Sequence, residues 1–209
     1  MITAVIFDFG GVITSSPFEA FNRLEADRGL PLDFIRRLNA ANPDTNAWAR
    51  FERSEITAVQ FDEAFDQEAR VAGHSLRGAD VIACLYGSVR PDMLEALRRI
   101  SARLKTGCIT NNVATERPEQ IGRTAAVQEA MSLFHHVIES SKAGIRKPDP
   151  RIYAMMCEAL DVAPANCVYL DDLGINLKPA RAMGMATIKV ESGPQALREL
   201  QSHIPFALQ

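Results

Sequence analysis

The sequence has few cysteines, and none of them forms the paired motif of a metal or redox site. The four cysteines are scattered without a CxxC pair, which argues against a zinc site. Cys108 and Cys167 fall within apolar, strand-like runs, where a reduced thiol behaves as a small buried apolar group. We therefore expect reduced, buried thiols and a cytoplasmic location.

Long apolar runs and blocks of one charge are also missing. No apolar stretch approaches the roughly 20 residues that span a bilayer. The N-terminus lacks a basic region followed by a long apolar one, so no signal peptide is expected. The net charge is −3 and no basic arm stands out, which argues against nucleic acid as a partner. These absences argue against a membrane or nucleic acid as a partner, and they do not give the oligomeric state.

The composition is that of a globular protein with one large domain, or a domain with an insert: 209 residues, 47% apolar and 23% charged. Apolar residues recur at helical spacing in four segments early in the chain: 18–25, 32–41, 46–53 and 57–72. Such a length of helix is too much for a simple crossover and predicts an inserted helical subdomain. A plain helical N-terminal half is the alternative, but a strand precedes these helices. Trp48 is expected in the core of this subdomain or lining a substrate pocket.

From Arg90 onward, predicted strands alternate with helices. The strands are expected at 107–110, 136–140, 166–170 and 186–190. The helices between and after them are expected at 91–104, from about 113 to 132, and at 150–160, 175–183 and 196–201. This alternation predicts an α/β fold whose parallel sheet is covered on both faces.

Residues 4–13 are the stretch around which the chain is organised. Four apolar residues lead into Asp8 without a polar face, as in a strand buried on both sides. Open parallel sheets bind ligands at the carboxyl ends of their strands, where Asp8 would lie. Gly10 and Gly11 then allow a sharp turn and a close approach. Asp8 is therefore the candidate reacting residue, with a plain capping role as the alternative.

Polar groups follow three predicted strands and should meet at one edge of the sheet. They are Asp8, Thr110 with Asn111, and Asp171 with Asp172. Converging carboxylates need a counter-charge, and oxygen ligands of this kind suit Mg²⁺. The rigid loop 144–150 offers Lys147 as the basic group, with a lone surface lysine as the alternative.

The order and spacing of these groups resemble the four motifs of the haloacid dehalogenase superfamily, over essentially the whole chain. Runs 144–150 and 169–185 are similar to the phosphatase-like N-terminal domain of soluble epoxide hydrolases and its single-domain bacterial relatives. The resemblance implies a Rossmann-like parallel-sheet core, residues 1–16 and 88–209, with a helical cap at 17–87 inserted after the first strand. No match to the epoxide-opening domain is present, so epoxide hydrolysis is not implied.

The resemblance also implies a mechanism and a metal. Asp8 would attack phosphorus and form an aspartyl-phosphate. Mg²⁺ would be held by Asp8, the backbone carbonyl of Gly10 and Asp172, with Asp171 supporting the metal site. Asn176 would hold this metal loop through a hydrogen bond, or be only a helix-turn residue.

The remaining implied roles concern the phosphoryl group. The Thr110 hydroxyl and the Asn111 backbone amide would bind its oxygens, and Lys147 would neutralise charge on Asp8 and on the transferring group. The function implied is a Mg²⁺-dependent phosphohydrolase acting on a small phosphorylated metabolite.

The sequence departs from the family's phosphatase pattern at Gly10. Phosphatases of this family carry a second aspartate there, which protonates the leaving group, and glycine has no side chain to replace it. General acid–base help contributes about 10²–10⁴-fold, so slow turnover is expected unless another group supplies the acid. Two alternatives stay open: a non-catalytic binding protein with this fold, and a 2-haloacid dehalogenase. The pair Asp171 and Asp172 speaks against the dehalogenase.

Overall fold

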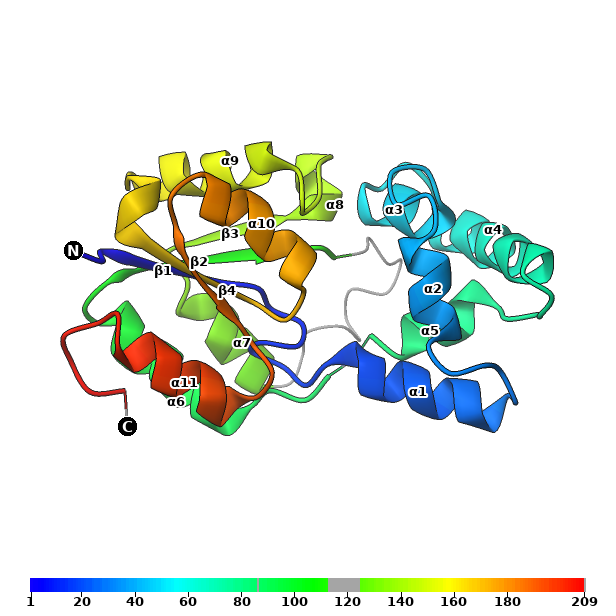
Figure 1. The fold of residues 1–209 in the computed structure, drawn as a ribbon, viewed down its shortest axis with the longest axis horizontal. Coiled ribbons are helices and arrows are strands. Elements are labelled where there is room, and N and C mark those ends of the chain that lie inside the picture. Colours follow the sequence, from blue (N-terminus) through cyan, green and yellow to red (C-terminus); the bar gives the residue numbers. More distant parts are fainter. Residues whose placement is uncertain (86, 113–124, 209) are drawn as a thin grey trace.

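Five parallel strands form the central sheet of this protein (Figure 1). The structure is a computed structural model that describes residues 1–85, 87–112 and 125–208. The strands are β1 (Ala4–Phe7), β2 (Lys105–Thr110), β3 (His136–Glu139), β4 (Cys167–Asp171) and β5 (Ala186–Lys189). Their order across the sheet is β3-β2-β1-β4-β5. The predicted α/β fold with a parallel sheet is confirmed.

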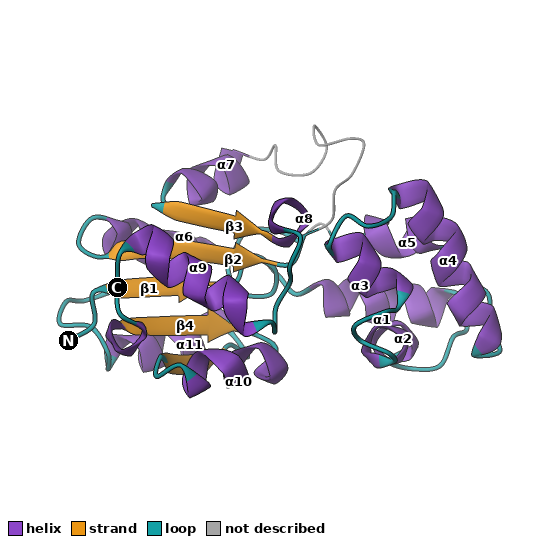
Figure 2. Cartoon of the chain, turned by 90° about the horizontal axis from the view of Figure 1, so that it is seen from above, coloured by secondary structure: helices purple, strands orange, loops and turns teal. Residues whose placement is uncertain are grey.

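Helices cover both faces of the sheet (Figures 1 and 2). One face carries α6 (Pro91–Ser101), α7 (Ala125–Ser132) and α11 (Gly193–Gln201), and the other carries α9 (Pro150–Leu160) and α10 (Gly174–Ala182). Side chains of β1 alternate between the two faces: Val5 and Phe7 join the α6–α11 cluster, whereas Ala4 and Ile6 join the α9–α10 cluster. Both faces are buried, which is why β1 has no polar side.

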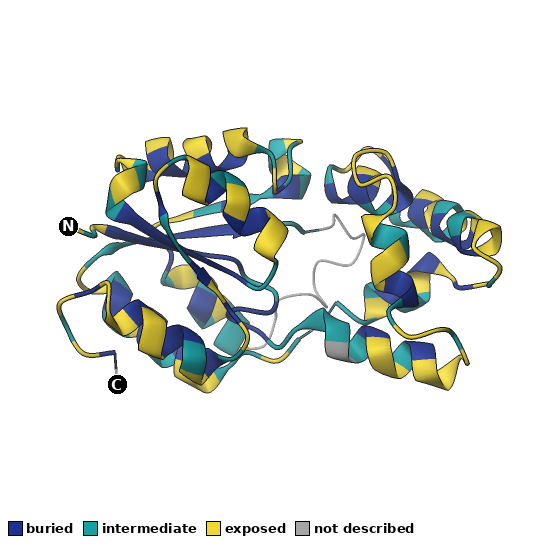
Figure 3. Ribbon diagram, in the orientation of Figure 1, coloured by how far each residue is buried: buried dark blue, intermediate teal, exposed yellow. Residues whose placement is uncertain are grey.

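A second group of helices lies beside the sheet's carboxyl-terminal edge (Figures 1 and 2). It consists of α1 (Pro17–Asp27), α2 (Phe34–Ala40), α3 (Ala47–Glu52), α4 (Ala58–Val71) and α5 (Gly78–Ala83). This helical unit has its own apolar core, in which Phe51 and Phe61 stack with ring centroids 4.5 Å apart. Figure 3 shows buried and exposed residues alternating along these helices. The division into a core at 1–16 and 88–209 and a cap at 17–87 stays a prediction.

The two segments that join the helical unit to the sheet run side by side. Thr14 and Val89 form an antiparallel bridge, and the Ser15 amide donates to the Ser88 carbonyl at 2.8 Å. The Arg90 amide donates to the Ile13 carbonyl at 2.8 Å. Entry to and exit from the helical unit therefore share one narrow connection.

Some predicted elements differ from those observed, chiefly at short helices. No helix was predicted at α5, nor at α8 (Ser140–Ala143), whose four residues are too few to show a helical period. A short 3₁₀ turn, η1 (Pro164–Asn166), precedes β4. The helix expected before Ser132 is seen as α7, and its predicted beginning lies outside the described residues. In the described part of the chain, no helix is both long and apolar enough to cross a membrane.

Candidate active site

Asp8 lies directly after β1, at the point where the strand order of the sheet reverses. The chain order of the strands runs outward from β1 in both directions, through β2 to β3 and through β4 to β5. Such a switch point is where open α/β sheets bind ligands. Phe7 is in register with Leu170, and the Asp8 amide donates to the Leu170 carbonyl at 2.8 Å. Register therefore brings Asp8 next to Asp171.

Lys147 occupies the space between these two carboxylates. Its ammonium nitrogen is 2.9 Å from Asp8 Oδ1 and 2.8 Å from Asp171 Oδ2, and only 1% of its side chain is exposed. Lys147 is thus not a surface lysine. The Asn111 side chain fixes its backbone from both sides, accepting from its amide at 2.8 Å and donating to its carbonyl at 3.0 Å.

Asp171 is the most fully hydrogen-bonded carboxylate of the group. It accepts from the Leu173 amide at 2.8 Å, from the Asn176 side chain at 3.1 Å, and from the Tyr169 hydroxyl. Asn176 therefore holds the loop after β4 and is more than a helix-turn residue. The sequence analysis missed Tyr169, whose one signal was its position two residues before Asp171 on the same face of the strand.

Burial, together with an excess of negative charge, shifts the pKa values at the site. Burial, together with repulsion from Asp171 and Asp172, outweighs the attraction of Lys147 and raises the pKa of Asp8 to about 8. Burial and repulsion from Asp171 raise the pKa of Asp172 to about 6. Burial opposes the charged form of Lys147, but Asp171 and Asp8 outweigh it and raise its pKa. Three carboxyl groups share one ammonium, so the site lacks positive charge.

The donor set suits a hard divalent cation. Asp8, Asp171 and Asp172 each offer an oxygen, and these oxygens lie within 4.8 Å of one another. Carboxylate oxygens are the ligands that Mg²⁺ favours, and a cation would supply the missing positive charge. Gly11 has φ +78°, and a Cβ there would overlap the Asp172 carboxylate. A Cβ at Gly10 would meet nothing within 4 Å, so this position is open.

The site opens into a large cavity between the sheet edge and the helical unit. The cavity has a volume of about 1520 Å³. The sheet contributes the predicted site residues Asp8, Gly10, Thr110, Asn111, Lys147 and Asp172 to its lining. Trp48 lines it from the helical unit, while its ring packs against Phe61 at a centroid distance of 5.9 Å. Trp48 therefore packs against the core of the helical unit and also lines the cavity; a role toward substrate stays a prediction.

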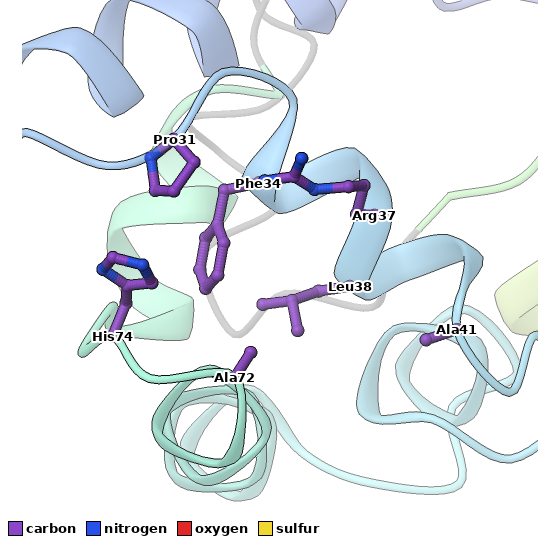
Figure 4. A pocket seen from close by; sticks show the side chains of 7 residues that line it. All are labelled: Pro31, Phe34, Arg37, Leu38, Ala41, Ala72 and His74. Atoms are coloured by element: carbon purple, nitrogen blue, oxygen red, sulfur yellow. The ribbon is translucent and has the colours of Figure 1, made fainter.

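A second, smaller pocket lies within the helical unit (Figure 4). It has a volume of about 300 Å³ and is lined mainly by apolar groups, with Phe34 edge-on to His74 at 5.0 Å. None of the predicted site residues reaches it. The large cavity is therefore the candidate active site.

Comparisons with known proteins agree with this geometry. A family model described as haloacid dehalogenase-like hydrolase matches residues 2–184. A protein named as a phosphatase, from Mycobacterium tuberculosis, is 32% identical over 96% of this chain and 94% of its own length. Mouse bifunctional epoxide hydrolase 2 is 32% identical over 93% of this chain, which covers 37% of that protein. The chain spans at most 38% of the longer curated relatives it matches.

The fold is also found in solved structures. A haloacid dehalogenase-family enzyme from Bacteroides thetaiotaomicron, solved with magnesium and inorganic phosphate, superposes with a TM-score of 0.62. The match has 16% identity and covers 92% of this chain and 96% of the other. The sheet order, the strand-end carboxylates and the family match lead to one conclusion. This chain is a hydrolase that belongs to the haloacid dehalogenase-like family.

Proposed function

We propose that the chain is a Mg²⁺-dependent phosphohydrolase that acts on a small phosphorylated metabolite through an aspartyl-phosphate. The observation that carries this proposal is the contact of Lys147 with Asp8 at 2.9 Å, inside a cavity also lined by Thr110 and Asp172. A nucleophilic carboxylate, a fixed ammonium and a second carboxylate that could hold a metal would together supply the positioning and charge stabilisation on which phosphoryl transfer depends. The phosphatase name of the bacterial relative supports the same reaction class.

In the first step, an oxygen of the deprotonated Asp8 carboxylate attacks phosphorus and the bond to the leaving oxygen breaks. The positive charge of Lys147 favours this deprotonated form, and a bound Mg²⁺ would favour it further. Lys147 remains within hydrogen-bond distance of Asp8 and offsets the negative charge that gathers there. The Thr110 hydroxyl makes no hydrogen bond to any described residue, and it lines the cavity, so it is available to a phosphoryl oxygen. Mg²⁺ bound by Asp8, the Gly10 carbonyl and Asp172 would neutralise further phosphoryl charge.

In the second step, water attacks phosphorus, the acyl-phosphate bond breaks, and phosphate leaves while Asp8 is regenerated.

The alkoxide that leaves in the first step must take its proton from solvent, because Gly10 provides no acid. Losing general acid help costs about 10²–10⁴-fold. We therefore expect slow turnover of alkyl phosphates and faster turnover of aryl phosphates, whose leaving groups need no proton.

The missing acid at Gly10 also favours a second candidate function. In this alternative the protein is non-catalytic and binds a phosphorylated ligand in the same cavity. A dehalogenase is the weaker alternative, since it has no use for the additional carboxylate Asp172. The cytoplasmic location predicted from the cysteines suits a metabolite-binding role under either candidate.

The deciding experiment is phosphate release from a panel of phosphomonoesters, with and without Mg²⁺. Wild type is compared with Asp8→Asn and with Asp27→Asn, which changes an exposed carboxylate at the end of α1. We expect release that needs both Mg²⁺ and Asp8, and that Asp27→Asn leaves unchanged. Acid quenching during turnover should trap phosphate on the wild type and not on Asp8→Asn.

Each other outcome points to a different function. Tight binding of a panel member without release, unchanged in the presence of Mg²⁺, supports the non-catalytic candidate. Halide release from 2-haloacids without metal supports the dehalogenase. Release that survives in Asp8→Asn rules out the aspartyl-phosphate route.

A further inference from the structure

Glu52, at the end of α3, makes the closest charged contact between the helical unit and the sheet. Its Oε2 lies 2.8 Å from Nε of Arg146, and the two side chains are 5% and 19% exposed. Among the described residues, no other ion pair joins α1–α5 to the rest of the chain. The contact is within ion-pair distance, and neither of its two atoms makes a hydrogen bond to a residue that the structure describes.

Hydrogen bonds around this pair join the same two surfaces. The Ser140 hydroxyl, in α8, is 2.8 Å from the Glu52 carbonyl. The Ser54 hydroxyl donates to the Ser141 carbonyl at 3.0 Å, and Arg146 Nη1 donates to the Pro43 carbonyl at 3.3 Å. The end of α3 therefore docks on α8 and on the loop before Lys147, and Figure 1 shows α3 and α8 facing each other.

The docked surface leads directly to the candidate catalytic groups. Arg146 precedes Lys147, whose backbone is held by Asn111. The Ser140 hydroxyl also accepts from the Asn112 amide at 3.0 Å. The segment that touches the helical unit, residues 140–146, is thus bonded to Asn112, which follows the predicted phosphoryl-binding residues Thr110 and Asn111, and it leads directly into Lys147.

We propose that Glu52 is a positioning residue. Its ion pair with Arg146 fixes the helical unit on segment 140–148, which comprises α8 and the loop after it, and thereby fixes Lys147 against Asp8. A buried ion pair contributes little net stability over an apolar pair, and its best-attested use is to set a register. Here the register is that of the helical unit over the sheet edge. The kinetic part of this inference rests on the proposed phosphohydrolase function, and the structural part does not.

The test compares four proteins: wild type, Glu52→Gln, the double variant Glu52→Gln/Arg146→Gln, and Asp62→Asn. The double variant removes both charges of the pair and so leaves neither one buried without a partner. It can therefore still be measured if Glu52→Gln folds poorly. Asp62→Asn is the matched control, because Asp62 pairs with Arg77 inside the helical unit and has a side chain 14% exposed. It does not line the cavity.

Two readouts are taken from each protein. The first is hydrogen exchange of the backbone amides in 140–148, which needs no enzymatic activity. The second is kcat and KM for an aryl phosphate with Mg²⁺. We expect faster exchange in 140–148 and a fall in kcat of about 10-fold or more, as a small misplacement of a catalytic group produces. Both changes should appear in the two Glu52 variants and be absent from Asp62→Asn.

The outcomes separate the inference from the proposed function. If the double variant regains the wild-type exchange and kcat, Glu52 has only a structural role and the inference is overturned. If the wild type releases no phosphate but the Glu52 variants still exchange faster in 140–148, the positioning role stands and the proposed function fails. Trp48 is the chain's one tryptophan and lies one turn before Glu52. A change of its emission in the Glu52 variants alone supports displacement of the helical unit.

Discussion

Gly11 lies against the carboxylate of Asp172, so closely that a Cβ at position 11 would overlap that side chain. The backbone at Gly11 has φ +78°, a conformation that other residues adopt only with strain. Gly10 has neither constraint, because its backbone is outside that region and a Cβ there would meet nothing within 4 Å. Adjacent glycines thus have different physical reasons for being present.

Gly11→Ala should therefore displace Asp172 and weaken Mg²⁺ binding, by 10-fold or more by analogy with disturbed metal shells, which lose about 10–100-fold. Gly10→Ala is the matched control and should keep both Mg²⁺ affinity and melting temperature. Isothermal titration with Mg²⁺ measures the affinities. Equal losses in the two variants would contradict the role assigned to Gly11.

Gly10→Asp should restore a general acid. A Cβ at this position would meet none of the described residues within 4 Å, so the start of a side chain is accommodated there. We expect kcat for alkyl phosphates to rise by up to about 10²-fold, the lower end of what general acid help supplies. Aryl phosphates should change less, because their leaving groups need no proton. Gly10→Asn matches the shape without the proton, and a similar gain in that variant would refute the explanation.

Lys147→Met should abolish turnover and destabilise the metal-free protein. Removal of the ammonium leaves Asp8 and Asp171 buried without their partner, and breaking a buried pair costs about 3–5 kcal/mol. Mg²⁺ should restore part of the stability by replacing the lost positive charge. Urea unfolding with and without Mg²⁺ measures both effects. Lys142→Met, at a side chain 78% exposed, should change neither stability nor turnover.

The stability of the metal-free protein should fall as pH rises from about 4 to 8. Asp8 keeps its proton in the folded chain up to about pH 8, whereas the ordinary value is 3.8. In this window the unfolded state binds fewer protons than the folded state, so the free energy of unfolding decreases with pH. The raised pKa of Asp172 also makes the free energy of unfolding decrease with pH, up to about pH 6. The raised pKa of Lys147 leaves it charged in both states throughout this window.

Asp8→Asn isolates this contribution, since asparagine does not titrate. Between pH 5 and pH 8, the free energy of unfolding should decrease in both proteins. The decrease in Asp8→Asn should be smaller than that in wild type by at least ~1 kcal/mol, because one pKa unit corresponds to about 1.4 kcal/mol. Saturating Mg²⁺ should flatten the wild-type profile. Parallel profiles of the two proteins without metal would show that Asp8 titrates normally.

Local patterns in the sequence were enough to predict the fold class and most of the sheet. A run such as Ala4–Phe7, apolar at every position, reports burial on both faces, and the strands after Arg90 alternate with helices of crossover length. Since parallel strands end at one edge, Asp8, Thr110 and Asp171 were expected together before any contact was known. The resemblance to the haloacid dehalogenase superfamily, which the family match supports, added the roles of these residues.

Contacts between distant segments depended on the tertiary structure. The ion pair of Glu52 with Arg146 joins residues whose local patterns show only a helix end and a loop. The open space at Gly10 and the overlap at Gly11 follow from where the Asp172 side chain lies, not from the glycines themselves. The physical reason is that periodicity records which face of an element is buried. Strand register and the docking of α3 on α8 decide which side chains meet there.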